Sequence, residues 1–470
     1  MKRATLKLGA LLPLLLAGCA ALEPEKNLAD VQQLTAGRTA GVAAPLQRPE
    51  ADQQAAVTDL LKAPLTAESA VRIALLNSPR LQQALLTLDL SDALRVQAGR
   101  APNPHFSVAE LAEGEQREIE RALRFDVVGL LFLPWRAQWQ NRQHELAKLQ
   151  AAQEIVRLAT EVRKAWIKAV AAQQSVQYLS DVKEAAEAGA ELARRMTRVG
   201  NFSKLQQARE QLVLADAAAQ LARAQQRAFS EREKLTRLLG LWGAQTQYTL
   251  LERLPELPGR PAAQDEIEAR ALRERLDVRA AVAETQYVAD ALGLVKTTGY
   301  LDGLTLAYKH TSTVDAAGAR AEKHGWELEL ALPIFDWGTA RNARAETIYM
   351  QSAVRVRNVA VQARSEAREA YYGWRTAWDL AHHYRDEVVP LRRFISDETL
   401  LRYNGMLMSV WDLLGEIRTQ SQSVNQALEA QRDFWLADAD LQLTLTGTSP
   451  GALAQLRGST PAEAAAAQGH

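Results

Sequence analysis

The feature that most restricts the fold is a long stretch of sequence without proline. From Trp135 to Leu254 the chain has no proline, and its many Ala, Gln, Glu, Arg and Leu residues favour helix almost throughout. Apolar and small residues recur there at alternating spacings of three and four, as in Ile155, Leu158, Val162, Ala165, Ala169, Ala172, Val176 and Leu179. Such a seam predicts long helices that pack closely in the manner of a coiled coil.

The same pattern returns about 205 residues later, which indicates an internal repeat. Arg163-Lys-Ala-Trp166 corresponds to Arg368-Glu-Ala-Tyr371, and the segment 77–81 matches the segment 274–278. The repeat covers most of the chain and predicts that one helix-strand-strand-helix unit has been duplicated.

A glycine lies near the middle of each helical region, at Gly200 and at Gly405. A reversal of the chain needs a residue that tolerates positive φ, and glycine does so without steric cost. A helix that ran straight from 140 to 240 would be about 150 Å long. We therefore expect two long helical hairpins that reverse at these glycines, rather than kinks in continuous helices.

Between Pro104 and Leu131, and again between Gly303 and Phe335, the helical period gives way to alternation. The apolar face of these segments comprises Leu304, Leu306, Tyr308, Trp326, Leu328, Leu330 and Leu332, and in the first copy Ile119, Leu123, Phe125 and Val127, which share it with Arg121. Strands of about 10 residues with this alternation suit the wall of a transmembrane β-barrel. A soluble two-sided sheet has the same period.

The number of strands decides what kind of barrel could form. Turn signals at Glu113-Gly114 and at Ala316-Ala-Gly318 divide the two segments into four strands. Roughly eight strands make the smallest closed membrane barrel, and open edges are not tolerated in lipid. A barrel built from this sequence would therefore take four strands from each of several chains.

The N-terminus has the anatomy of a secretory signal. The basic residues Lys2, Arg3 and Lys7 precede an apolar run from Leu8 to Leu16, which is too short to span a bilayer as a helix. The run ends in Leu16-Ala-Gly-Cys19, which resembles the lipobox of bacterial lipoproteins. The resemblance implies cleavage before Cys19, a diacylglycerol on its thiol and acylation of its amine, which together anchor a chain stably. A non-lipidated signal with a chance cysteine is the alternative.

Charge, composition and motif context argue against several other classes of protein. The 56 Lys and Arg residues balance the 56 Asp and Glu residues, so we expect no nucleic-acid partner. The single cysteine excludes disulfides and cysteine-based zinc sites. Gly447-Thr-Ser449-Pro-Gly451 fits a nucleophile motif but no strand precedes it, and the adjacent His382 and His383 diverge on a helix. The sequence does not support an enzyme or a metal site.

Several motifs together resemble the TolC-type outer membrane factors, and with the lipobox the resemblance is to their lipidated branch. They are the strand-to-helix junction at Ala331-Leu-Pro-Ile-Phe-Asp-Trp-Gly338, the end of the first repeat at Leu238-Leu-Gly240, and the two tips from Gly200 to Ser203 and from Gly405 to Ser409. The sequence departs from the family at Leu133-Pro-Trp-Arg136 and by an extra residue in the second tip.

The resemblance implies a mostly α fold with a membrane β-barrel. The expected assembly is a homotrimer with a twelve-stranded barrel in the outer membrane and a long α-helical barrel in the periplasm. It would conduct substrates passively from an inner-membrane pump and a periplasmic adaptor, and its only cofactor would be the covalent lipid on Cys19. The expected divisions are a signal (1–18), a lipid-anchored extended arm (19–65), the first repeat (66–265), the second repeat (266–446) and a flexible tail (447–470). A lipid-anchored periplasmic coiled-coil scaffold without a channel is the alternative.

The hairpin tips are the candidate sites. We expect adaptor docking at Val199, Gly200, Phe202, Ser203, Gly405, Met406, Leu407 and Ser409, since apolar groups at a solvated turn suit a partner. Packing of these groups within the tip is the alternative. The candidate mouth charges are Arg198, Arg402, Asp397 and Asp412. They would either pair between helices and hold the mouth closed, or remain solvated, because exposed pairs contribute only about 0–1 kcal/mol each.

Overall fold

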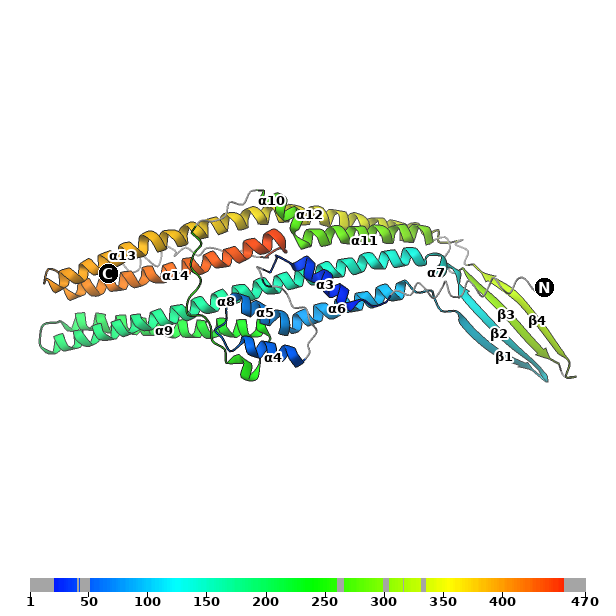
Figure 1. Cartoon of the computed structure of the whole chain (residues 1–470), viewed down its shortest axis with the longest axis horizontal. Helices are drawn as coiled ribbons and strands as arrows, with labels where there is room; N and C mark the ends of the chain where they lie inside the picture. The colour runs from blue at the N-terminus through cyan, green and yellow to red at the C-terminus, as the bar shows by residue number, and fades with distance from the viewer. Residues whose placement is uncertain are drawn as a thin grey trace. The chain divides into compact units, whose positions relative to one another are not determined.

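The computed structural model describes residues 21–39, 42, 51–259, 266–298, 304–315, 317–330 and 335–451 (Figure 1). Cys19, residues 331–334 of the junction and the tail beyond 451 therefore lie outside the described residues. The main elements in chain order are α3 (Pro24–Thr35), α4 (Ala51–Leu60), α5 (Ala67–Asn77), α6 (Pro79–Ala98), β1 (His105–Glu113), β2 (Gln116–Asp126), α7 (Val127–Leu131), α8 (Leu133–Arg198), α9 (Lys204–Leu239), α10 (Ile267–Glu274), α11 (Leu276–Thr298), β3 (Thr305–Val314), β4 (Arg320–Glu329), α12 (Thr339–His383), the π-helical segment η2 (Tyr384–Val388), α13 (Val389–Asn404) and α14 (Val410–Thr446).

The chain divides into two compact units, which we describe separately. The strand unit comprises residues 1–31, 84–151 and 278–360, and the hairpin unit comprises residues 32–83, 152–277 and 361–470. Each unit takes parts from both copies of the repeat. The element order confirms the duplicated helix-strand-strand-helix arrangement, since α6, β1, β2 and α8 are followed later by α11, β3, β4 and α12.

The strand unit contains one antiparallel sheet in the order β1-β2-β3-β4. The predicted turns are confirmed, with positive φ at Gly114 and Gly318. One detail of the prediction is wrong, because Val127 does not extend the apolar face of β2. The strand ends at Asp126, whose carboxylate accepts a hydrogen bond from the Gly129 amide at 2.8 Å and so caps α7.

The arm predicted to be extended contains two helices, α3 and α4. Pro24 is the first residue of α3, where proline's fixed φ suits a helix and its missing N–H is no loss. In the strand unit Val31 is fully buried. Proline at this position starts a helix rather than preventing one.

A buried polar cluster holds α3 within the strand unit. His144 is 2% exposed, with Nδ1 2.8 Å from Ser91 Oγ and Nε2 2.9 Å from the Asn27 amide oxygen. Ser91 Oγ donates to the Leu88 carbonyl at 2.7 Å, so it accepts from Nδ1–H. If the ring is neutral, Nε2 carries no proton and is an acceptor. With the Asn27 side-chain amide rotated by 180°, its otherwise unpaired Nδ2 would donate to His144 Nε2. Burial and the nearby Lys148 lower the pKa of His144, which agrees with a neutral ring.

The hairpin unit confirms both reversals. α8 ends at Arg198 and α9 begins at Lys204, while α13 ends at Asn404 and α14 begins at Val410. Small residues allow the helices of the second copy to pack closely around two aromatic rings. The buried cluster there includes Ala367, Ala370, Trp374, Ala377, Ala381, Phe434, Ala437 and Leu441. In the first copy, six of the eight predicted seam residues are buried, namely Ile155, Leu158, Val162, Ala165, Ala169 and Ala172, whereas Val176 and Leu179 are half-buried.

Each copy of the repeat has an equivalent joint between three helices. In the first copy the end of α9 meets the junction of α5 and α6, and in the second the end of α14 meets the junction of α10 and α11. In the first, Asn77 Nδ2 donates to the carbonyl of Gly240 at 2.7 Å, where α9 ends. In the second, the Leu276 amide donates to the carbonyl of Gly447 at 2.8 Å, where α14 ends. Gly240 has φ +69, and an added Cβ would lie 2.7 Å from the Asn77 carbonyl oxygen. The duplicated glycines therefore mark equivalent closely packed joints.

Candidate functional site: the strand sheet and the hairpin tips

The register of the sheet separates its side chains into two faces. Rows of directly opposed residues run across all four strands, and alternate rows point to opposite sides. One row, which we call the aromatic row, consists of Phe106, Leu123, Tyr308 and Trp326. The next row toward the helices on the same side contains Phe125, Leu306 and Leu328. These two rows define the apolar face.

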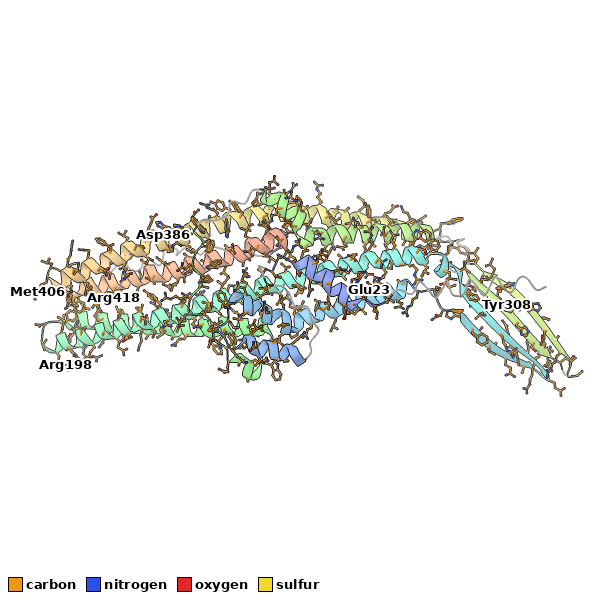
Figure 2. All side chains as sticks on the ribbon, viewed as in Figure 1. Glu23, Arg198, Tyr308, Asp386, Met406 and Arg418 are labelled. Carbon is orange, nitrogen blue, oxygen red and sulfur yellow. The ribbon has the colours of Figure 1, made fainter. Side chains whose placement is uncertain are left out.

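Much of the apolar face is uncovered within this chain. Phe106 is 66% exposed, Trp326 69% and Leu328 67%. The Tyr308 and Trp326 rings meet edge-on with centroids 5.2 Å apart, so these two side chains of the aromatic row pack together. Figure 2 labels Tyr308 on the sheet. A contiguous exposed apolar surface of this kind indicates contact with lipid or another protein.

The opposite face of the sheet is charged. Lys309 lies between two carboxylates, 3.2 Å from Glu120 and in an ion pair with Glu327 on the other neighbouring strand. Within the strands this face carries six carboxylates, Glu113, Glu118, Glu120, Asp126, Glu327 and Glu329, against the three cations Arg124, Lys309 and Lys323. We call it the charged face. The predicted alternation is confirmed, and the sheet has one apolar side and one polar side.

The first hairpin tip is closed by a Schellman-type turn. Gly200 has φ +82, and the Asn201 amide donates to the Met196 carbonyl at 3.0 Å. Ser203 then caps α9 in a capping box with Gln206. Val199 is 70% exposed, whereas Phe202 is only 8% exposed. Phe202 stacks on Trp411 of α14 with centroids 4.0 Å apart, so it packs within the tip.

The second tip corrects the expectation for Gly405, whose φ is −80. The left-handed residue is Met406, with φ +58, and the Leu407 amide donates to the Arg402 carbonyl at 2.9 Å. Ser409 caps α14 three residues later, just as Ser203 follows Gly200. The two turns are therefore equal in length, with Met406 in the place of Gly200, and the extra residue does not enlarge the second turn.

Met406 and Leu407 are the most exposed apolar groups of the tips, at 93% and 79%. Figure 2 shows Met406 and Arg198 at the ends of their hairpins. A non-glycine residue with positive φ is uncommon and costs roughly 1–2 kcal/mol. Local strain at an exposed apolar turn is typical of a functional position.

The four candidate mouth charges do not pair with one another among the described residues. Arg198, Asp397 and Arg402 are exposed, and Asp412 serves as a cap. Hydrogen bonds from the Ser409 hydroxyl and from its backbone amide lower the pKa of Asp412. Pairs between the hairpins occur further from the tips, with Arg418 2.6 Å from Glu210. A gating role for the four charges stays a prediction.

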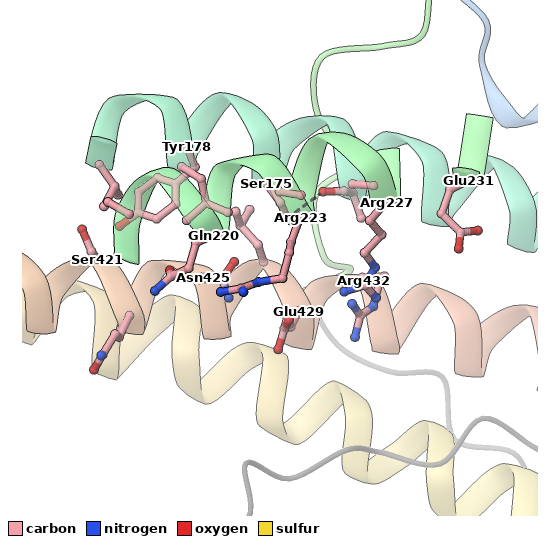
Figure 3. Close-up of a pocket in the computed structure, with 18 of the residues that line it drawn as sticks. Ser175, Tyr178, Gln220, Arg223, Arg227, Glu231, Ser421, Asn425, Glu429 and Arg432 are labelled. Atoms are coloured by element: carbon pink, nitrogen blue, oxygen red, sulfur yellow. Dashed lines mark hydrogen bonds between the residues drawn. The ribbon is translucent and has the colours of Figure 1, made fainter. Parts of the chain in front are cut away.

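A groove of about 1120 Å³ lies in the hairpin unit between α8, α9 and α14. Figure 3 shows Arg223 and Arg227 of α9 and Glu429 and Arg432 of α14 around the same space. Lining cations and carboxylates are nearly balanced, comprising Lys168, Arg223, Arg227, Arg418 and Arg432 against Asp216, Glu231, Glu429 and Asp433. This mixed lining does not select one class of charged ligand.

The residues of the catalytic-looking motifs have other partners. Ser449 Oγ donates to Glu366 at 2.7 Å rather than to a histidine. His382 and His383 pair with different carboxylates, Asp386 at 2.7 Å and Glu387 at 3.1 Å. Among the described residues, no group of three His, Cys, Asp or Glu side chains is placed to hold a metal ion.

None of the described helices combines the length and the apolar composition that crossing a bilayer requires.

Comparison with known proteins identifies the class of fold to which this chain belongs. No protein-family model and no curated protein sequence matches the chain, but solved bacterial outer membrane proteins share its fold. The outer-membrane channel OprN is 18% identical with a TM-score of 0.66, covering 87% of this chain and 95% of that one. The Vibrio cholerae outer membrane protein VceC is 16% identical with a TM-score of 0.65, covering 81% and 96%. The Neisseria gonorrhoeae outer membrane channel MtrE is 16% identical with a TM-score of 0.65, covering 81% and 89%.

These likenesses confirm the fold predicted from the motifs, which is that of the TolC-type outer membrane channels. At this level of identity they establish the architecture alone. The sequence did not reveal Trp411, which stacks on Phe202, and although Met406 was a candidate docking residue, its positive φ was not predicted. The spacing from Met406 to Ser409, equal to that from Gly200 to Ser203, is the signal that could have located the second turn.

Proposed function

We propose that this chain is the outer membrane channel subunit of an efflux or type I secretion system. Three copies would close a twelve-stranded barrel in the outer membrane and continue as a helical tunnel into the periplasm. Substrates from an inner-membrane pump and a periplasmic adaptor would pass through it passively. The observation that carries the proposal is the four-stranded sheet, whose strands of 9, 11, 10 and 10 residues match the length that crosses a bilayer.

The edges of the sheet support assembly from several copies. β1 and β4 each pair with only one neighbour within the described chain. Unpaired edges cannot remain in lipid, because every backbone polar group there needs a partner. Joining β4 of one copy to β1 of the next satisfies both edges, with the apolar face toward lipid and the charged face toward the lumen.

The tips are proposed as the periplasmic docking site for the adaptor. Val199, Met406 and Leu407 supply exposed apolar surface on turns that are otherwise solvated. Phe202 contributes by fixing the first tip against Trp411 rather than by direct contact. Ser203 and Ser409 hold the turns in shape as helix caps, and Gly200 supplies the positive φ of the first turn.

The lipid on Cys19 is proposed as a second attachment to the outer membrane. The support is the lipobox in the sequence together with α3, which the strand unit holds through His144 and Lys148. The intact mass of the mature protein and of the Cys19→Ala variant tests this point. A mature mass without acyl chains would contradict it.

Reconstitution tests the channel itself. Purified protein should be trimeric by light scattering and should give discrete conductance steps in a planar bilayer. A periplasmic scaffold would give neither. Absence of both a trimer and conductance would overturn the proposal.

A matched pair of variants tests the orientation of the sheet. Leu306 lies on the apolar face and Thr305, its neighbour on β3, lies on the charged face near Glu329. Arginine on a lipid-facing strand position costs about 2–4 kcal/mol at the bilayer centre and about 0–1 kcal/mol near the interfaces, and Leu306 is the second residue of β3, toward one interface. Leu306→Arg should therefore reduce insertion of the trimer into vesicles, whereas Thr305→Arg should insert normally. Equal insertion of both variants would mean that the apolar face does not meet lipid.

A further inference from the structure

Helix α6 exposes an apolar stripe that the chain itself does not cover. Leu86, Leu90 and Leu94, which we call the leucine stripe, follow one another at spacings of four and so lie on one side of the helix, and all three are exposed. The exposed positions of α6 within the strand unit are all uncharged, and they are Leu86, Thr87, Leu90, Ala93, Leu94 and Gln97. A solvated helix face usually carries charge, so this side of α6 suits contact with another protein surface.

Within the chain, α8 and α11 show how the two copies of the repeat meet beside the sheet. The Trp139 and Tyr287 rings stack with centroids 5.4 Å apart and an interplanar angle of 12°. One turn further along α8, Arg142 Nε lies 3.5 Å from a carboxylate oxygen of Asp290. The second helix of the first copy therefore packs on the first helix of the second copy, next to the pairing of β2 with β3.

The helices of the strand unit follow the same order as the strands that they adjoin. On one side of the α8–α11 contact, Ser91 of α6 bonds to His144 of α8, and on the other side Lys296 of α11 lies 2.7 Å from Glu346 of α12. The order is therefore α6-α8-α11-α12, beside β1-β2-β3-β4 (Figure 1). The end helices α6 and α12 adjoin the two edge strands, β1 and β4.

The repeat assigns to α12 a surface equivalent to that of α8. At the offset of about 205 residues between the copies, Arg344 and Thr347 take the places of Trp139 and Arg142. Both are exposed, and so is Val354, two turns further along the same side. The side of α12 that corresponds to the internal contact of α8 is therefore open in a single chain.

The leucine stripe is the other half of this surface. At the offset of about 197 residues that relates α6 to α11, Leu90 and Ala93 take the places of Tyr287 and Asp290, and both are exposed. The phenol ring and the carboxylate of the internal contact are thus replaced by a leucine and an alanine. Burial of the leucine stripe would be favourable without a partner charge, and the aliphatic stem of Arg344 could cover Leu90 while its guanidinium group stays in water.

We propose that α12 of one copy packs against α6 of the next copy, in the manner in which α8 packs against α11 within the chain. The occupant of the leucine stripe is thus a second copy of this chain. The inference rests on the proposed function, because joining β4 to β1 of the next copy brings together the helices that adjoin those strands. It adds a helical seam between copies, with Leu90 beside Arg344 and Ala93 beside Thr347.

Chemical cross-linking of the purified full-length protein tests the seam. A short bismaleimide should convert the Leu90→Cys, Arg344→Cys double variant into covalent dimers and trimers on a denaturing gel, because each copy reaches the next. Each single variant should remain monomeric on the gel. The wild type, whose single cysteine is Cys19, measures the background.

The matched control is the Leu90→Cys, Glu346→Cys double variant. The Glu346 side chain is 56% exposed on the same helix as Arg344, but it pairs with Lys296 of α11 and so lies away from the proposed seam. This variant should remain monomeric on the gel. Equal cross-linking in both double variants would show random collision and overturn the proposal, as would cross-linking confined to single chains.

Light scattering and conductance separate this inference from the proposed function. A trimer in solution that gives no cross-link between α6 and α12 would overturn this inference alone. The cross-linked trimer without conductance in a planar bilayer would overturn only the channel. Absence of any trimer would overturn both.

Discussion

Arg275 offers a quantitative test of how the second repeat is joined. It is 1% exposed in the hairpin unit, with Nη2 2.6 Å and Nε 2.9 Å from the two Asp277 oxygens and Nη1 2.8 Å from Glu366. Burial opposes its charge, but the hydrogen bonds to the two carboxylates outweigh burial and raise its pKa. Ser449, beyond the end of α14, bonds to both carboxylates. Through these two carboxylates, Arg275 connects the start of α11, α12 and the segment that follows α14.

Replacing Arg275 by methionine removes the cation and leaves two carboxylates facing each other. Removing one partner of a buried ion pair costs about 3–5 kcal/mol. We expect the lower end, about 3 kcal/mol, because the Asp277 and Glu366 side chains keep 21% and 12% of their exposure. That cost corresponds to a roughly 150-fold increase in local opening.

The assay is hydrogen exchange measured by mass spectrometry, in which local opening appears as faster exchange of the Leu276 and Ser449 amides. The matched control is Arg273→Met, whose side chain is 65% exposed and 3.9 Å from its nearest carboxylate, so it should change little. A combined Arg275→Met, Asp277→Leu, Glu366→Met variant should regain most of the protection at Leu276, whose amide donates to the Gly447 carbonyl, because no unpaired charge remains. The Ser449 amide loses its Asp277 acceptor in this variant, so recovery is measured at Leu276 alone. Less than a fivefold effect of Arg275→Met, or no recovery in the combined variant, would refute the reasoning.

Two further predictions concern α3 and the second tip. Burial lowers the pKa of His144 in the fold, so His144 binds a proton more readily when α3 is detached. Protection of the α3 amides should be complete above about pH 6.5 and decline below it. His144→Gln should remove this pH dependence in exchange measurements at pH 7.5 and 5.5. Met406→Gly should relieve the backbone strain of the positive φ and slow hydrogen exchange of the Leu407 amide about fivefold. Gly200→Ala should introduce such strain and accelerate exchange of the Asn201 amide. Faster exchange of the Leu407 amide in Met406→Gly would show that Met406 is not strained.

Much of the fold follows from sequence periodicity. Long helices and alternating strands have different periods, and each remains regular enough here to be recognised, even where Arg121 interrupts the apolar face of β2. The serines that cap α9 and α14 lie where the tips were expected, because a cap is a local interaction between residues three apart. Local chemistry and period were therefore sufficient for the main elements.

The errors arose where tertiary contacts override local preference. Glycine is the usual residue for positive φ, yet the second turn places Met406 there and leaves Gly405 in an ordinary conformation. The helix α3 lies in a proline-containing arm, and its contacts come from residues more than a hundred positions away, such as His144. Neither feature has a signature within a short window of sequence.

The difference between the two turns has a consequence for symmetry. A homotrimer of a duplicated chain has six hairpin ends, which would be equivalent if the copies had stayed identical. In the proposed homotrimer, Gly200 in one turn and Met406 in the other would make the ends alternate, so the ring would be threefold rather than sixfold. Duplication within one gene thus allows each class of hairpin end to evolve separately, so that a partner can distinguish neighbouring positions around the ring.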